Sequence, residues 1–251
     1  MHAYTIRESP RAKYVRLKVT LEGELVVVVP RGADLSRIPS LVRREHAWIE
    51  KAKLSMARQQ SAWRSRAPQT LPDHIDLAAV AEQWPVEYRP NGPGRAAARE
   101  HASGCLVVSG DPGDSELGAG ALRRWTARKA RRRLVPRLSL LSKEHVLPFG
   151  SAAIRSQRTR WASCSPRGTI SLNQKLLFLP PRLVDYVLIH ELCHTVHLNH
   201  SRRFWALVKR HEPDCRELDR ELREAWRYVP WWMCEPGSGE LNQSHAETLA
   251  P

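Results

Sequence analysis

Residues 187–205 read VLIHELCHTVHLNHSRRFW and contain an H-E-x-x-H pattern, from His190 to His194, with His200 six residues further on. Residues four apart lie one turn apart on the same face of an α-helix, so His190 and His194 are placed to bind one metal ion. Glu191 lies about 100° around the helix, where it can contact a water molecule beside that ion. Two imidazole ligands and a general base are the core of a zinc hydrolase site.

An amphipathic helix is predicted to carry this pattern. Pro181 suits the first turn, where its missing N–H is harmless, and Asp185 suits the positive end of the helix dipole. Asn199 is predicted to end the helix in a left-handed conformation, after which the chain turns back and brings His200 to the metal from another direction. The apolar residues that recur at helical spacing are Leu183, Val184, Val187, Leu188 and Leu192.

The third metal ligand has several candidates. His200 completes the spacing H-E-x-x-H-x-x-x-x-x-H, which is the ligand spacing of metzincins. His197 is a rival, but it would continue the same helix about 10 Å along the axis from His190, and ligands strung along one helix converge poorly on a tetrahedral ion. Glu212 and Glu217 offer carboxylates from the region that follows. We favour His200.

The chain has 251 residues and a net charge of +14, so it can form one large domain or two small ones with a basic surface that attracts anions. The five cysteines are scattered and form no C-x-x-C pair, which favours neither a disulfide framework nor a thiolate zinc site. The N-terminus is polar, and no apolar run approaches the roughly 18 residues of a membrane-spanning helix. We therefore expect a cytoplasmic protein without membrane contact.

The N-terminal part is predicted to form a β-hairpin followed by a helix. Residues 13–19 alternate apolar and basic side chains, and Leu25–Val29 is a run of β-branched residues, with a turn expected at Glu22 between them. Asp34 is predicted to cap a helix that runs to about Leu54. The region 58–120 is rich in Pro, Gly and Ala and is predicted to be mostly loops.

Short strands are predicted within that loop-rich region, near Trp84–Tyr88 and Cys105–Val108. A second hairpin is predicted further on, in which Ala153–Gln157 and Thr169–Asn173 flank a turn at residues 165–168. The turn sequence, Ser-Pro-Arg-Gly, has Pro at its second position and Gly at its fourth.

Residues 119–145 are predicted to form a long helix with one apolar stripe, made of Leu122, Trp125, Leu134, Leu138 and Leu141. Its other faces carry eight cations within fifteen residues, a density that is compatible with nucleic-acid binding and also with an ordinary solvated face. The candidates for nucleic-acid contact are Arg124, Arg128, Arg131 and Arg132.

After His200, Ser201 is predicted to cap a helix that ends before Pro213. Asp214 and Glu217 resemble a capping box for a further helix that runs to about Trp226.

Several motifs between residues 152 and 224 closely resemble the YgjP-like and SprT-like zinc metallopeptidases. The resemblance implies a zincin-type catalytic domain with one Zn²⁺ ion, in which His190, His194 and His200 are ligands and Glu191 is the general base. One position departs from the family, because Ala162 stands where the family has Gly. The matching motifs are Arg160-Trp-Ala-Ser-Cys164, Ile170-Ser-Leu-Asn173, Leu179-Pro-Pro181, His190-Glu-Leu-Cys-His194, Asn199-His-Ser201, and Phe204 with Trp205.

The predicted fold is therefore α+β. A zincin-like catalytic domain, with a small antiparallel or mixed sheet and the H-E-x-x-H helix, is expected over residues 119–235. A β-rich region with one or two helices and many loops precedes it over residues 1–118, and a mobile tail is expected at 236–251.

The predicted function is hydrolysis of peptide bonds, with a peptide or protein as substrate. Arg160, Trp161 and Asn173 are candidates for substrate binding, and Arg160 or Asn173 is a candidate for oxyanion stabilisation, although a purely structural hydrogen bond is an equal alternative. The strand at 169–173 is a candidate for holding an extended peptide. Two other functions stay open: a protease that acts on DNA-bound proteins, and a scaffold in which zinc only cross-links the chain.

Overall fold

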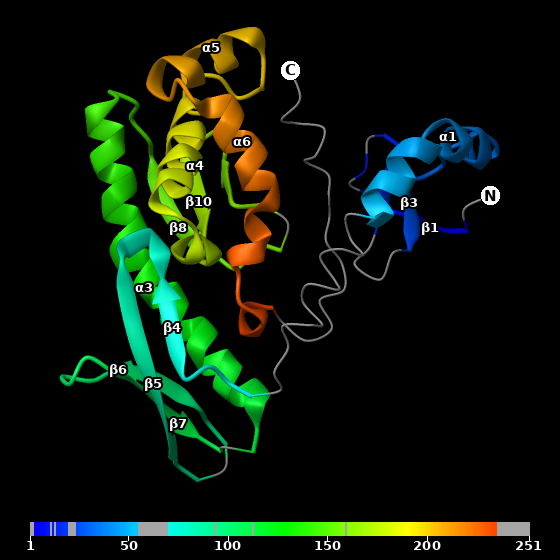
Figure 1. Ribbon diagram of the computed structural model, residues 1–251. Coiled ribbons are helices and arrows are strands. Elements are labelled where there is room, and N and C mark those ends of the chain that lie inside the picture. Colours follow the sequence, from blue (N-terminus) through cyan, green and yellow to red (C-terminus); the bar gives the residue numbers. More distant parts are fainter. Residues whose placement is uncertain are drawn as a thin grey trace. The chain divides into compact units, whose positions relative to one another are not determined.

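The computed structural model describes residues 3–10, 12, 14–19, 24–54, 70–92, 94–111, 113–158 and 160–234 (Figure 1). These residues form two compact units, one within residues 3–54 and the other within residues 70–234. The tail expected at 236–251 and the turn expected at Glu22 lie outside the described residues.

The first unit contains a three-stranded sheet, with β1 (Tyr4–Glu8), β2 (Arg16–Val19) and β3 (Leu25–Val29) in the order β1-β3-β2. The predicted hairpin is confirmed, because β2 pairs antiparallel to β3. The sequence did not predict β1, which pairs parallel to β3. Four of its five residues are exposed, so the strand lacks the apolar alternation that marks a half-buried strand.

The helix expected after Asp34 is present but divided. Asp34 accepts a hydrogen bond from the N–H of Ser36 at 3.0 Å and so caps a short 3-10 turn, which leads into α1 (Ile38–Arg44). A break at Glu45 separates α1 from the helical residues 46–54. One face of the sheet and these helices enclose the core of this unit, made of Val19, Leu25, Val27, Val29, Ile38, Val42, Ile49 and Ala52.

The second unit begins with a four-stranded sheet in the region that was expected to be mostly loops. Its strands follow the order β4-β5-β7-β6, with β5 parallel to β7 and the other pairs antiparallel. The strands predicted near residues 84–88 and 105–108 are confirmed as β5 and β7, whereas β4 and β6 were not predicted. Both are only four residues long, and pairing with their neighbours outweighs their weak β-propensity. The strands are β4 (His74–Leu77), β5 (Glu82–Pro90), β6 (Ala97–Glu100) and β7 (Leu106–Gly110).

The predicted long helix is confirmed as α3 (Ser115–Glu144), and its five predicted stripe residues are all buried. It packs against β6 and β7 near its N-terminus and against β8 and α4 further along (Figure 1). Residue 118, where the sequence suggests a domain boundary, therefore falls inside a helix that packs against the four-stranded sheet and also against β8 and α4.

A third sheet follows α3, with β8 (Ser151–Arg155), β9 (Ala162–Cys164) and β10 (Thr169–Asn173) in the order β8-β10-β9. The turn at 165–168 is confirmed, since the N–H of Gly168 donates to the carbonyl of Ser165 at 2.9 Å. The predicted strand pairing was wrong, because this turn joins β9 to β10 and β8 pairs parallel to β10. A strand of three residues, such as β9, is too short to show an alternating pattern.

Helices cover this sheet in the C-terminal part of the unit (Figure 1). The cap at Ser201 is confirmed, because its hydroxyl accepts the N–H of Phe204 at 3.4 Å. The capping box at Asp214 is not formed, since that carboxylate pairs with Arg182 and makes no cap bond. The elements are η3 (Gln174–Phe178), α4 (Pro181–Cys193), α5 (Arg202–His211), α6 (Cys215–Glu224), η4 (Ala225–Tyr228) and η5 (Trp231–Met233).

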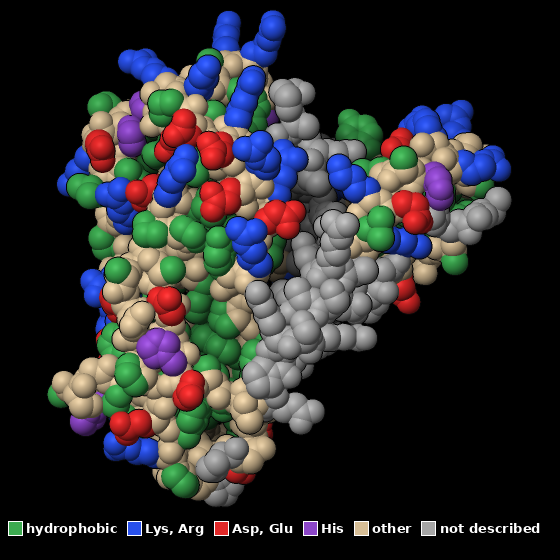
Figure 2. Space-filling model, in the orientation of Figure 1, with side chains coloured by type: hydrophobic (Ala, Val, Ile, Leu, Met, Phe, Trp, Pro, Cys, Tyr) green, Lys and Arg blue, Asp and Glu red, His purple; other side chains and the backbone are tan. Residues whose placement is uncertain are grey.

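Together these elements give the α+β fold with small mixed sheets that the sequence predicts. In the described residues, no helix is both long enough and apolar enough to cross a membrane. Lys and Arg side chains are spread over the face seen in Figure 2 and gather over α5.

Candidate active site

The helix α4 is buried along most of its length, and it carries His190 and Glu191 into the interior of the second unit. It ends at Cys193, with His194 as its C-terminal cap residue. The predicted left-handed residue at Asn199 is wrong, because the only described non-glycine residues with positive φ are Ala81 and Val146. The helix stops about one turn earlier than predicted, and residues 194–200 form the turn that leads to His200.

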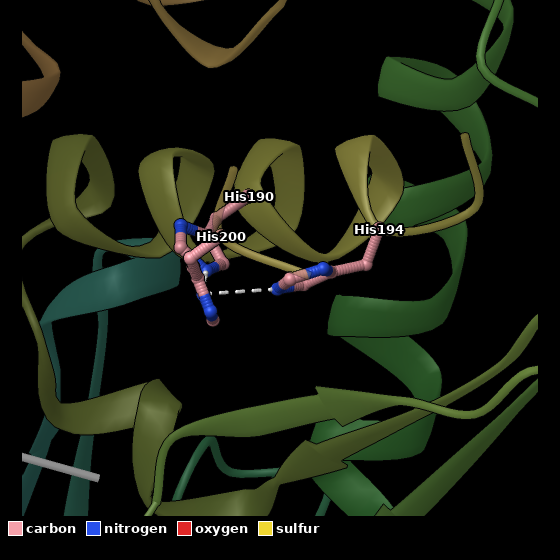
Figure 3. Close-up of side chains that lie close together, drawn as sticks. All are labelled: His190, His194 and His200. Carbon is pink, nitrogen blue, oxygen red and sulfur yellow. Dashed lines mark hydrogen bonds between the residues drawn. The ribbon is translucent and has the colours of Figure 1, made fainter. Parts of the chain in front are cut away.

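Three histidine rings converge beside the end of α4 (Figure 3). The Nε2 atom of His200 lies 3.2 Å from the Nε2 atom of His190 and 3.2 Å from that of His194. The possible ligand atoms of these residues all lie within 4.8 Å of one another. No other group of three or more His, Cys, Asp or Glu residues within the described ranges comes together in this way, so Glu212 and Glu217 do not join the cluster.

His197 contributes its backbone carbonyl and not its ring. The carbonyl oxygen of His197 lies 3.0 Å from Nδ1 of His194, which is hydrogen-bond distance. Because a carbonyl oxygen can only accept a hydrogen bond, Nδ1 must carry the hydrogen. With the proton on Nδ1, the lone pair of His194 is on Nε2, which faces the other two rings. The turn after α4 therefore fixes both the orientation and the tautomer of this imidazole.

Aromatic side chains from α5 form a wall against the three histidines. Phe204 is fully buried and stacks on His194 with a centroid distance of 4.3 Å, and it also contacts His190 and His200 edge-on at 4.9 Å and 4.8 Å. Trp205 lies 5.8 Å and 5.9 Å from the rings of His190 and His200. Composition and spacing indicate only that Phe204 and Trp205 belong to an apolar helix face. The family resemblance is what includes them among the matching motifs.

The carboxylate of Glu191 is buried and incompletely satisfied. The backbone N–H of Cys164 donates to it and the charge of Arg160 acts on it, yet burial outweighs both and raises the pKa of Glu191 to about 8. Its Oε2 atom is buried and has no hydrogen-bond partner. This oxygen is therefore able to accept a hydrogen bond from a bound group.

Burial also acts on the histidines. It lowers the pKa of His190 well below the ordinary range, helped by the neighbouring His194 and His200. Burial likewise lowers the pKa of His194, against the effect of the His197 carbonyl. Both rings are therefore neutral near pH 7, which is the form of imidazole that binds metals.

The strand β9 forms the edge of its sheet beside Glu191. The carbonyl of Trp161 accepts from Asn173, and the N–H of Ser165 donates to Thr169, each at 2.9 Å. Hydrogen bonding alternates along an antiparallel strand, so Ala162 and Cys164 direct their backbone groups away from β10. The Cys164 N–H on that outer side reaches Glu191. Burial and the charge of Glu191 raise the pKa of the Cys164 thiol to about 11, which keeps it protonated.

Of the three residues predicted to bind substrate, two are built into the interior. Asn173 is fully buried, and its side chain donates to the carbonyls of Gln157 and Arg160 and accepts the N–H of Lys175. Trp161 is 8% exposed and stacks on Trp226 at 4.2 Å. These contacts hold Gln157, Arg160 and Trp161 in place and so favour the structural alternative.

Arg160 is different, because its side chain is partly exposed. Its guanidinium makes no hydrogen bond or ion pair with any described residue, although its charge is felt by Glu191. It is the one of the three candidates whose side chain is available to a ligand.

The cations of α3 are mostly engaged within the protein. Arg124 and Arg128 donate to the carbonyls of Ala96 and Ala98, at 2.7 Å and 2.8 Å, and so cover the edge strand β6. Four more bind carboxylates or backbone carbonyls; they are Arg123, Lys129, Arg133 and Arg137. Arg131 and Arg132 are exposed, without partners among the described residues.

Comparison with known proteins gives one family. Residues 13–225 match the sequence model of the family described as YgjP-like, metallopeptidase domain. No curated protein matches the chain. Two crystal structures of metallopeptidase zymogens have short similar regions: abylysin of Pyrococcus abyssi, with 28% identity, and jannalysin of Methanocaldococcus jannaschii, with 18% identity. Each match covers 36% of this chain, and 93% and 94% of those chains, with a TM-score of 0.33.

The family match spans most of both compact units and includes the histidine cluster, Glu191 and β9. The chain belongs to the YgjP-like metallopeptidase family.

Proposed function

We propose that this protein is a zinc-dependent peptidase, in which His190, His194 and His200 bind one Zn²⁺ ion and Glu191 is the general base. The proposal rests on a single juxtaposition. Three histidine nitrogens converge on one point, and the neighbouring residue on α4 holds a buried carboxylate oxygen without a partner. The same reasoning assigns the second unit a zincin-like arrangement, with a mixed sheet beside the H-E-x-x-H helix.

The three imidazoles fit a zinc ion. Zn–N bonds of about 2.0–2.1 Å at tetrahedral angles place two ligand nitrogens about 3.3 Å apart. Two of the Nε2 pairs lie at 3.2 Å. The Nδ1 contact of His194 with the His197 carbonyl is the kind of outer partner that metal-binding histidines use. Zinc is favoured over Mg²⁺ or Ca²⁺, because those ions prefer oxygen ligands.

The number of ligands separates catalysis from a structural role. A structural zinc site has four protein ligands, whereas three protein ligands with an open position are typical of a catalytic one. The described residues supply three, and Glu191 stands beside them. The scaffold alternative therefore has the weaker support.

In the proposed reaction, bound zinc supplies Lewis acidity, which polarises a carbonyl and acidifies water. Glu191 accepts the proton of the attacking water at Oε2 and then donates it to the leaving amine. The Cys164 N–H anchors the carboxylate, so the side chain does not have to reorient between the two transfers. Phe204 keeps the histidine rings in place and excludes water from their far side.

The peptide substrate is proposed to add to β9. The sequence suggested the strand at 169–173 for this role, but β10 pairs on both of its sides and has no free edge. The outward backbone groups of Ala162 and the carbonyl of Cys164 lie on the same side as Glu191, where an extended peptide would pair by strand addition. Ala162 has no positive φ, so the departure from the family Gly causes no strain there.

Arg160 is proposed to bind a carbonyl or carboxylate of the substrate. It is partly exposed, close enough to influence Glu191, and without an internal partner among the described residues. Association with nucleic acid through α3 has less support, since Arg124 and Arg128 are bound to backbone carbonyls. A cytoplasmic location is part of the proposal and fits five free thiols.

The proposal is tested by cleavage of a peptide library, with the products identified by mass spectrometry. The protein is compared in three states: loaded with zinc, stripped by a chelator, and reloaded. Cleavage that disappears on stripping and returns with one equivalent of zinc is the expected result. A protein that binds one zinc ion tightly and cleaves no peptide would instead support the scaffold.

A further inference from the structure

The exposed face of α5 is strongly basic. Four of its ten residues are exposed cations, and with Ala206 they occupy one side of the helix from end to end. Figure 2 shows the cluster of Lys and Arg over this helix. None of the four has a carboxylate partner among the described residues. They are Arg202, Arg203, Lys209 and Arg210.

This lack of partners separates α5 from the other basic helix. On α3, six of the nine cations are bound by carboxylates or by backbone carbonyls, so their charge stabilises the fold. The four exposed cations of α5 have no such partners among the described residues, so they do not stabilise the fold through ion pairs. The four cations are therefore available to bind an acidic ligand.

The basic face is tied directly to the histidine cluster. The helix begins two residues after His200, and its opposite face places Phe204 and Trp205 against the histidine rings. A helix with its side chains is about 10–12 Å across, which an extended peptide spans in three or four residues. A chain held at the site would thus reach the basic face a few residues from the bond that is cut.

The surroundings of the basic face favour a polypeptide over a nucleic acid. Proteins that bind single-stranded nucleic acid present aromatic rings on which bases stack. The two aromatic residues of α5 instead face the histidines, and Phe204 is fully buried. The loop before α5 exposes two apolar side chains, Val196 at 53% and Leu198 at 60%. Cations next to small apolar side chains are complementary to an acidic peptide that contains aliphatic residues.

We propose that the exposed face of α5 selects acidic polypeptide substrates, by binding Asp or Glu side chains that lie three to five residues from the scissile bond. This inference rests on the proposed peptidase function and adds the substrate class to it. Because the cations are exposed to solvent, they act mainly on substrate capture and hence on KM, with little effect on kcat.

The test uses the full-length, zinc-loaded protein and fluorogenic peptides that share one cleavable core and differ only in acidic, neutral or basic flanks. We expect acidic flanks to raise kcat/KM by about tenfold over neutral ones at low salt, through KM. The preference should shrink as salt rises from about 0.05 M to about 0.5 M. The variant Arg202→Glu/Arg203→Glu should lose it, and acidic residues in the first helical turn should not harm folding.

The matched control is Arg216→Glu/Arg220→Glu on α6, which changes the net charge by the same amount at exposed positions of another helix. This control should keep the acidic preference. If wild type cleaves all three peptides equally, or if both double variants lose the preference alike, the assignment to α5 is overturned while the peptidase function stands. If no peptide is cleaved, the result contradicts the proposed peptidase function itself. Fluorescence anisotropy of an uncleavable acidic peptide measures binding without cleavage. It therefore tests the assignment to α5 separately from the peptidase function.

Nucleic acid is tested alongside. A DNA oligonucleotide that binds wild type and is released by Arg202→Glu/Arg203→Glu, with peptide preference unchanged, would identify a nucleic-acid surface and overturn the proposal.

Discussion

Two buried charged groups of the second unit, Lys129 on α3 and Glu191 on α4, are treated in opposite ways. The ammonium of Lys129 lies 2.8 Å from Glu82 and 3.1 Å from Glu100, and it also sits over the ring of Trp84 at 4.2 Å. Glu191 has one backbone N–H and the charge of Arg160, and its Oε2 atom has no partner.

The difference separates structure from function. A buried charge costs several kcal/mol unless opposite charges and hydrogen bonds compensate for it. At Lys129 the protein supplies the compensation itself, and the result is attachment of α3 to the strands β5 and β6. At Glu191 the compensation is incomplete, because one buried carboxylate oxygen has no hydrogen-bond partner. A group retained at such a cost is expected to work on something that binds there.

The largest expected effect concerns the histidine cluster beside Glu191. His200→Ala removes one of the three converging nitrogens, so we expect peptide cleavage to fall by about 10³-fold or more, equivalent to about 4 kcal/mol. Zinc affinity, measured by competition with a chelating dye, should fall at least about 100-fold. His197→Ala is the control, because that residue contributes only its backbone carbonyl. Equal losses in the two variants would contradict the ligand assignment.

Substitution of Lys129, whose buried charge is compensated within the protein, is expected to lower stability without lowering zinc binding. Lys129→Met keeps most of the side-chain volume but leaves Glu82 and Glu100 with less compensation, so the free energy of unfolding should fall by about 3 kcal/mol. Urea unfolding followed by tryptophan fluorescence measures it. Arg132→Met, at an exposed position of the same helix, should change stability by less than about 0.5 kcal/mol. A Lys129→Met protein of unchanged stability would show that the ion cluster is not structural.

A substitution of Asn173 tests whether this residue stabilises the fold or binds the substrate. Its side chain holds Gln157 and Arg160, so Asn173→Ala should lower the free energy of unfolding by about 2 kcal/mol, since the Arg160 carbonyl loses its donor and the Gln157 carbonyl keeps only Lys175. Urea unfolding and peptide cleavage are measured on the same preparation. A selective fall in kcat at unchanged stability would assign Asn173 to the substrate after all.

The smallest expected effect comes from the end of α3. Val146 has φ of 57° and is 82% exposed, so a β-branched side chain occupies a left-handed position and gains little from packing. Val146→Gly should raise the stability by about 0.5–1 kcal/mol, because relief of strain exceeds the entropy that Gly adds to the unfolded chain. Val146→Ala keeps a Cβ atom and should give less than half of this gain. Thermal unfolding of the two variants decides it.

Local patterns were sufficient to predict α3, α4 and the hairpin of β2 and β3. In each, a periodic apolar face or a run of β-branched residues carries the signal. The short strands β4, β6 and β9 have no such face, and only their pairing partners make them strands. The wrong partner for β10 has the same cause: β9 shows no pattern of its own, so the sequence predicts the next strand upstream as the hairpin partner.

For the site, spacing brought out His190, Glu191 and His194, because a helix fixes their mutual geometry. The position of His200 depends on a turn, and its convergence with the other two rings follows from tertiary structure. Nothing local marks Asn173 as an internal anchor, since its partners lie 13 and 16 residues away in the sequence. The roles of Arg124 and Arg128 could not be predicted either, because the carbonyls that bind them lie in and just before β6, which the sequence does not reveal.

The most direct test of the central claim is one measurement on Glu191→Gln beside wild type: zinc content by elemental analysis and peptide cleavage on the same samples. Gln has the shape of Glu but cannot accept the proton, so the account predicts one zinc ion per chain in both proteins and a fall in cleavage of about 10²–10⁴-fold in the variant. Full turnover by the zinc-loaded variant would contradict the account.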